Sequence, residues 1–254
     1  MNKHLSVLAL QARNSIFKIF KLFLVMACVE AGGFWYALRK DIWTEYGIME
    51  SELENSVWGF EIYLQKSHVA IVALAAVGVM TLLLYLGGTE THRCKTSYTY
   101  KRLRITEKQI LFWQAIYNGF CYFMFWIVQV LIALGLWAIY RDYALEENVN
   151  LITNQTLYLA TYRSGFLHGL LPLDDWLVWL RNIIMVIASG LVTARYAISQ
   201  RSKIGVGGLV ILLAFYSTFP IRLGEESISM LAGTFSLSIA SMIPSFIKDW
   251  RDEL

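Results

Sequence analysis

Residues 111–140 read LFWQAIYNGFCYFMFWIVQVLIALGLWAIY and contain no acidic or basic side chain. A helix needs roughly 20 apolar residues to cross a hydrocarbon core about 30 Å thick, so this run is long enough to span a bilayer. It does not alternate between polar and apolar residues, as a barrel strand would. We therefore predict a membrane-spanning helix here and a helical fold for the chain, because lipid accepts only backbones whose hydrogen bonds close internally.

The composition of the whole chain is that of a membrane protein. Of its 254 residues, 57% are hydrophobic and only 16% are charged, whereas globular domains carry about 25% charged residues. Apolar windows predict six spans in a single all-α transmembrane domain that covers residues 1–254. The six windows are 22–38, 69–86, 111–140, 176–197, 204–219 and 228–247.

Positive charge is distributed unevenly between the two sides of these spans. If the N-terminus is cytosolic, the cytosolic segments hold 15 of the 22 Lys and Arg residues, and the external segments hold 6. Cytosolic loops of membrane proteins are enriched in Lys and Arg, so both termini are predicted to lie in the cytosol. The formal net charge of +3 is the sum of two opposed faces, and it gives no reason to expect a nucleic-acid partner.

The segments outside the spans carry further predictions. The first 20 residues are amphipathic and predict a helix that lies in the membrane interface, in contact with lipid headgroups. The external segment 141–175 contains the run GFLHGLLP at 165–172, which we expect to lie on or dip into the outer leaflet. The spacing of His and Cys residues predicts neither a metal site nor a disulfide framework.

The segment between the second and third predicted spans is basic and rich in tyrosine. Residues 90–109 read ETHRCKTSYTYKRLRITEKQ. Gly87-Gly88 predicts the end of the second span, and the capping box Thr106-x-x-Gln109 predicts that the third begins near Glu107. A basic loop can be held by anionic lipid at about 1 kcal/mol per charge. The aromatic and apolar residues favour instead a short helix seated in a groove of a partner protein.

These features together resemble the permease subunit of a type 2 ATP-binding-cassette exporter. In that family, the loop after the second span carries a coupling helix, which docks on a separate ATPase subunit. The family pattern runs from a Glu, through a Thr, to Leu-Pro-(Ile or Val)-(Ser or Thr), and Arg104 stands here where proline is common. The coupling surface implied by the resemblance comprises Glu90, Thr96, Tyr98, Thr99, Tyr100, Lys101, Arg102, Leu103, Arg104 and Ile105.

The resemblance also implies how the work is divided between subunits. ATP and Mg would act on the partner ATPase, since this chain has no Gly-x-x-x-x-Gly-Lys-Ser/Thr phosphate loop, no catalytic residues and no cofactor of its own. A second copy or a homologous permease would complete the complex in the bacterial plasma membrane. A peptide or a hydrophobic small molecule would then cross by alternating access.

Three polar residues inside the predicted spans are candidates for a translocation path. Glu30 lies near the midpoint of the first span, where a charge costs at least about 2.5 to 3.5 kcal/mol on insertion scales. It is either a path or gating carboxylate, or a protonated or hydrogen-bonded contact between helices. Asn118 and Gln129 are the next candidates, although amides in membranes also join helices.

Three other functions stay open at this stage. The chain could be an ion-coupled secondary transporter with Glu30 as the coupling acid, a membrane-embedded enzyme acting on lipids or peptides, or an accessory scaffold. A secondary transporter commonly contains an internal repeat. An enzyme needs a convergent set of nucleophile, base or metal ligands. The sequence reveals neither.

Overall fold

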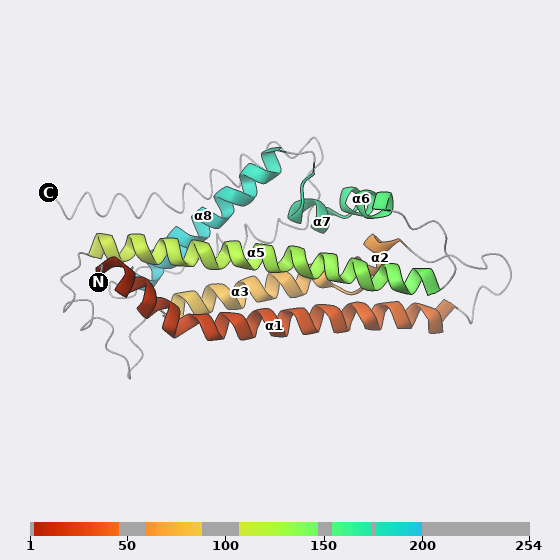
Figure 1. Ribbon diagram of the computed structural model, residues 1–254, viewed down its shortest axis with the longest axis horizontal. Coiled ribbons are helices and arrows are strands. Elements are labelled where there is room, and N and C mark those ends of the chain that lie inside the picture. The colour runs from red at the N-terminus through yellow and green to blue at the C-terminus, as the bar shows by residue number, and fades with distance from the viewer. Residues whose placement is uncertain (1–2, 46–58, 88–106, 147–153, 174–175, 200–254) are drawn as a thin grey trace.

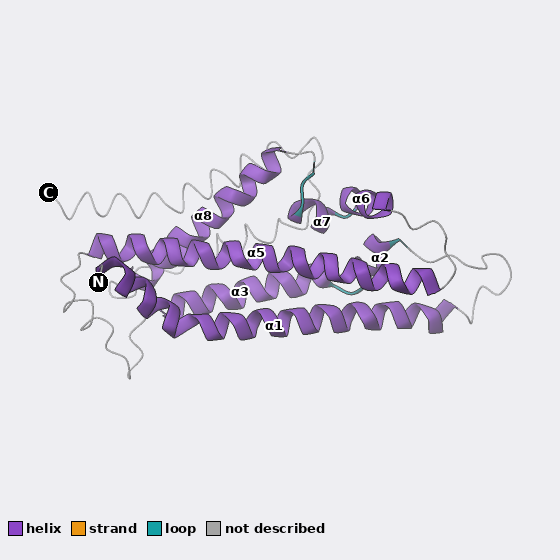
Figure 2. Cartoon of the chain, viewed as in Figure 1, coloured by secondary structure: helices purple, strands orange, loops and turns teal. Residues whose placement is uncertain are grey.

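The computed structural model describes residues 3–45, 59–87, 107–146, 154–173 and 176–199 (Figure 1). Within these ranges every regular element is a helix, so the all-α prediction is confirmed for this part of the chain (Figure 2). The fifth and sixth predicted spans and the implied coupling surface, residues 90–105, lie outside the described residues.

Four long helices dominate the described structure, and three short helices accompany them. The long helices are α1 (Lys3–Glu45), α3 (Val69–Gly87), α5 (Glu107–Glu146) and α8 (Trp176–Ser199). The short helices are α2 (Phe60–Lys66), α6 (Asn154–Arg163) and α7 (Gly165–Leu170). Helices α1, α3 and α5 run side by side, and α8 crosses α5 obliquely (Figure 1).

The long helices alternate in direction along the chain. As a result, the start of α1, the end of α3, the start of α5 and the end of α8 all lie at one end of the bundle, which we call the N-terminal end (Figure 1). The short helices α2, α6 and α7 lie at the opposite end. The end of α3 at Gly87 and the start of α5 at Glu107, which flank the basic segment in the sequence, are therefore both at the N-terminal end.

Two helices are long and apolar enough to cross a membrane, namely α5 over Gln109–Leu145 and α8 over Trp176–Arg195. Helices α2 and α3 meet at a bend of 53° and together count as a third candidate span. The predicted first span lies inside α1, which is not among these candidates and which carries Lys18, Lys21, Glu30 and Arg39. The described residues thus contain two or three candidate membrane spans, which indicates a membrane protein.

Local signals in the sequence agree with several helix ends. Helix α3 ends at Gly87 and α5 begins at Glu107, both as predicted. The predicted interface segment and the predicted first span instead form one continuous helix of 43 residues, which bends near its N-terminal end (Figure 1). The external segment 141–175 contains the end of α5 and the short helices α6 and α7.

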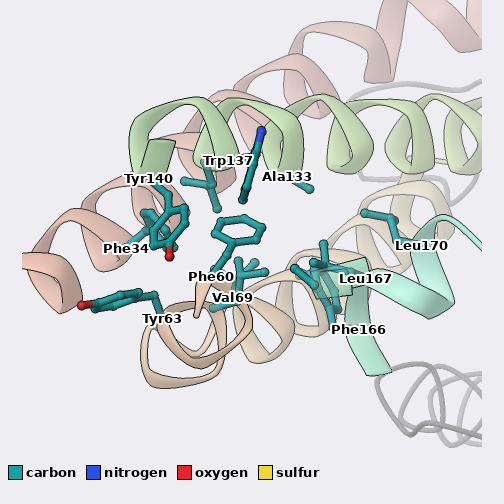
Figure 3. Packing of buried hydrophobic residues seen from close by; sticks show 14 of the residues in the cluster. Phe34, Phe60, Tyr63, Val69, Ala133, Trp137, Tyr140, Phe166, Leu167 and Leu170 are labelled. Carbon is teal, nitrogen blue, oxygen red and sulfur yellow. The ribbon is translucent and has the colours of Figure 1, made fainter. Parts of the chain in front are cut away.

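Two apolar clusters hold the helices together. At the opposite end, Phe60 is fully buried among aromatic rings, with its centroid 5.7 Å from Phe34 and 5.3 Å from Trp137 (Figure 3). Edge-to-face and tilted ring pairs of this kind stabilise beyond the area that they bury. The second cluster joins α1, α3 and α5 nearer the N-terminal end, around Met26 and Met80. Helices α1, α3 and α5 are thus packed along most of their shared length.

Candidate functional site

Polar side chains on α5 point into the bundle and connect this helix to each of its long neighbours. Gln114, Asn118 and Gln129 are all buried. The spacing of these three positions, at intervals of four and eleven residues, keeps them on one face of a helix with 3.6 residues per turn. We call these three side chains the polar line of α5. They interrupt a stretch of this helix that has no charged residue between Gln109 and Tyr140.

Glu30 on α1 and Gln129 on α5 form one of these buried contacts. The Gln129 side-chain amide Nε2 donates a 2.9 Å hydrogen bond to Glu30 Oε2. Glu30 is 1% exposed and Gln129 is 2% exposed, so bulk water does not share this contact. Two of the three residues predicted for a translocation path are thus brought together by the structure.

Asn118, the third predicted residue, lies elsewhere. Its Nδ2 donates a 2.9 Å hydrogen bond to Thr193 Oγ1 on α8, and it is eleven residues, or about 16 Å along the helix, from Gln129. Thr193 donates in turn to the Ser189 carbonyl oxygen of its own helix at 2.6 Å. Asn118 therefore joins α5 to α8 and is separate from the Glu30 pair.

Hydroxyl pairs complete the polar line and were not singled out by the sequence reasoning. Tyr122 on α5 and Thr81 on α3 share a 2.8 Å hydrogen bond, and Tyr117 on α5 and Ser15 on α1 share one of 2.7 Å. The spacing of Tyr122 and Asn118, four residues apart, is the signal that could have placed them on the same helix face. These contacts favour a cohesive role, in which hydrogen bonds join membrane helices.

A cavity of about 60 Å³ lies between α3, α5, α7 and α8. Its wall is mostly aliphatic and aromatic, and the polar exceptions are Tyr122, Gln129 and Asn182. Ligand sites are commonly apolar cavities with a few placed polar groups. The cavity therefore has the chemistry to hold an apolar group, with Gln129 forming part of its wall.

The short helix α7 is fastened to the wall of this cavity by its backbone carbonyls. Asn182 Nδ2 on α8 donates to the Gly169 carbonyl oxygen at 2.8 Å, and Trp126 Nε1 on α5 donates to the Leu170 carbonyl oxygen at 3.0 Å. Each bond satisfies a carbonyl in the last turn of α7, where the helix itself supplies no donor. Helix α7 is therefore anchored to both α5 and α8.

Arg181 is a buried cation beside this anchor. Its side chain is 4% exposed, and its Nε and Nη2 donate to Asn182 Oδ1 at 3.3 Å and 3.1 Å. Asn182 thus accepts from Arg181 while donating to Gly169. In the sequence, Arg181 is the one Lys or Arg residue of the 22 that falls on neither side of the spans, because it lies just within the fourth predicted span.

No group of three or more His, Cys, Asp or Glu residues that could hold a metal ion occurs in the described ranges. Comparison of the chain with protein-family models, with curated proteins and with solved structures finds no match. The polar line, the cavity and the anchor of α7 are therefore the features on which a functional proposal can rest.

Proposed function

We propose that this chain is the membrane-spanning permease subunit of an ATP-binding-cassette exporter in the bacterial plasma membrane. A separate cytosolic ATPase would dock on residues 90–105, and a second copy or a homologous permease would complete the transport unit. ATP hydrolysis on the ATPase would rock the helices between inward-open and outward-open arrangements.

The alternating direction of the long helices is the observation that supports this proposal most. It gathers the start of α1 and both ends of the α3–α5 connection at the N-terminal end of the bundle (Figure 1). That is the end where the excess of Lys and Arg falls in the sequence, and such an excess favours the cytosolic side. A cytosolic ATPase would therefore meet the basic, tyrosine-rich segment.

The cavity gives limited support for the class of cargo. Its wall is largely apolar, with Gln129 and Asn182 among the lining residues. Such a wall suits a hydrophobic small molecule or an apolar peptide side chain. We accordingly propose cargo of this chemistry rather than a small ion.

Copurification from the native host tests the proposal. Tagged chain should bring down an ATPase subunit, and Leu103→Asp should abolish that association while membrane insertion is unchanged. Leu159→Asp is the matched control, because Leu159 is an exposed residue of α6 at the opposite end, so the ATPase should stay bound. If the ATPase stays bound after deletion of residues 98–103, the docking assignment is wrong.

A second candidate, an ion-coupled secondary transporter, is favoured by one observation. Glu30 is a buried carboxyl group that meets a polar partner in the middle of the bundle, as a coupling acid would. ATP-independent uptake or efflux that follows an imposed ion gradient, and that is lost in Glu30→Gln, would favour this candidate. ATP-driven transport that is unchanged in Glu30→Gln would remove Glu30 from the transport mechanism.

A further inference from the structure

The contact between Glu30 and Gln129 leaves two oxygen atoms unaccounted for. Gln129 Nε2 donates to Glu30 Oε2, but neither Glu30 Oε1 nor Gln129 Oε1 has a hydrogen-bond partner among the described residues. Each of these oxygens exposes less than 1 Å² of surface. Buried polar atoms are nearly always hydrogen-bonded, so two unpartnered acceptors on one contact require an explanation.

We propose that Glu30 is a proton-binding site, in which the proton sits on Glu30 Oε1 and is donated to Gln129 Oε1. The carboxyl group and the amide would then form a closed pair with two antiparallel hydrogen bonds. One runs from Gln129 Nε2 to Glu30 Oε2, and the other from Glu30 Oε1 to Gln129 Oε1. A single proton satisfies both unpartnered oxygens and leaves no charge inside the bundle.

The other possible ligands fit less well. A water-sized molecule does not reach either oxygen, because each is sealed from a probe of that size. A hard cation such as Ca²⁺ or Mg²⁺ takes six or more oxygen ligands, whereas only two are free here. Reversing the amide would set its carbonyl oxygen against Glu30 Oε2, and that arrangement also requires a proton.

Among the described residues of α1, α3 and α5, no opposite charge lies close to Glu30 along its helix or on the facing apolar stretches, and the buried Arg181 of α8 donates to Asn182 Oδ1. On α1 itself the nearest charged residues are Lys21 and Arg39, each nine positions away, or about 13 Å along the helix. Helix α3 has no charged residue, and α5 has none between Gln109 and Tyr140. Helix α2 lies at the opposite end of the bundle, and its charged residues are Glu61 and Lys66. Glu61 forms a 3.5 Å ion pair with Arg163.

Helix α5 carries its charged residues only at its two ends, namely Glu107, Lys108, Arg141, Asp142 and Glu146. The remaining titratable groups on the helices packed against α1 are phenols, a thiol and the histidine that joins α2 to α3. They are Tyr63, His68, Tyr85, Tyr117, Cys121, Tyr122, Tyr140 and Tyr143. Tyr122 already shares its hydroxyl with Thr81. If Glu30 lost its proton while the contact between α1 and α5 stayed closed, a buried negative charge would be left with one hydrogen-bond donor. We therefore expect Glu30 to release its proton only when this contact opens.

Infrared spectroscopy of the full chain in phosphatidylcholine bilayers at neutral pH tests this proposal without reference to transport. Exposed Asp and Glu side chains are ionised at that pH, so the spectrum should contain a protonated-carboxyl band that is lost in Glu30→Gln. This variant should remain folded, because an amide–amide pair keeps both hydrogen bonds. A difference spectrum that contains only carboxylate bands would overturn the proposal.

A swapped pair provides the second arm. The double substitution Glu30→Gln with Gln129→Glu reverses the acid and the amide, so it should restore the protonated-carboxyl band and keep the thermal stability of the wild type. Absence of the band from the swapped variant would overturn the closed pair. Should Glu30→Gln fail to fold, the wild-type and swapped spectra still decide the matter.

Discussion

Gly190 on α8 lies directly against Gly119 on α5, at the place where the two helices cross. A Cβ atom on Gly190 would stand 2.8 Å from the backbone nitrogen of Gly119 and 2.8 Å from the carbonyl oxygen of Ala115. Both contacts are with backbone, which cannot rotate away. The absence of a side chain at Gly190 is therefore what allows α5 and α8 to approach so closely, as small residues do in membrane helix pairs.

We predict that Gly190→Ala destabilises the folded chain by about 1 to 3 kcal/mol, the usual cost of overpacking a close contact. Denaturant unfolding in detergent micelles measures the change. Gly119→Ala and Gly135→Ala are matched controls, because a Cβ at Gly119 would lie 3.9 Å from the Val186 carbonyl oxygen and one at Gly135 would meet nothing within 4 Å. Equal stability of the Gly190→Ala and Gly135→Ala variants would contradict the crossing as described.

The hydrogen bond between Asn118 and Thr193 predicts an energetic coupling between α5 and α8. A double-mutant cycle with Asn118→Ala and Thr193→Val should give a coupling free energy of about 0.6 kcal/mol, the average for side-chain hydrogen bonds between membrane helices, and at most about 1.7 kcal/mol. A second cycle with Asn118→Ala and Leu191→Ala should give a value near zero, because Leu191 is on the exposed side of α8. A coupling free energy near zero in the first cycle would mean that the hydrogen bond between Asn118 and Thr193 does not stabilise the packing of α5 against α8.

The aromatic cluster at the opposite end predicts a large loss when Phe60 is truncated. Phe60→Ala should lower the free energy of unfolding by about 3 to 5 kcal/mol, because its ring is fully buried among Phe34, Trp137 and Tyr140. Phe17→Ala is the control, since Phe17 is 73% exposed. Thermal unfolding of both variants in the same detergent compares them, and similar losses would argue against this cluster as a packed core.

His68, between α2 and α3, predicts an unusual response to glycine. Its φ of 55° lies in the left-handed region, which costs an ordinary residue about 1 to 2 kcal/mol. Glycine removes this strain, but it costs roughly 0.5 to 1 kcal/mol because a glycine loses more backbone entropy on folding. We therefore expect His68→Gly to stabilise the chain slightly and His68→Val to destabilise it.

Ser67 provides the comparison for His68. Its φ is −79°, and its hydroxyl donates to the Leu64 carbonyl oxygen at 3.0 Å, so Ser67→Gly should lose stability. The same unfolding assay applies to all three variants. A loss at His68→Gly as large as that at Ser67→Gly would contradict the assignment of strain to His68.

Much of the helix layout could be predicted from local signals in the sequence. Long apolar runs bracketed by glycine and by capping residues placed the end of α3 at Gly87 and the start of α5 at Glu107. These signals act within a few residues of the chain, so they can be recognised without knowledge of neighbours. The helix predicted over the first 20 residues is continuous with the first predicted span, because local amphipathicity does not determine where a helix ends.

The contacts of the candidate site could be predicted only in part. Glu30, Asn118 and Gln129 stood out because polar groups are costly in lipid, but their partners depend on how each helix is rotated. That rotation is set by non-local packing, such as the approach of Gly190 to Gly119. The pairing of Glu30 with Gln129 and of Asn118 with Thr193 therefore appears only in the assembled bundle.

The side of the membrane on which residues 90–109 lie is the most direct test of the account, because a cytosolic ATPase can dock only on the inner side. Cys94 in a chain carrying Cys28→Ser and Cys121→Ser should resist a membrane-impermeant thiol reagent in intact cells and react after permeabilisation. The same background with Cys94→Ser and Leu159→Cys places the thiol on α6 at the opposite end, where intact cells should be labelled. Labelling of Cys94 in intact cells would contradict the proposed orientation and, with it, the exporter assignment.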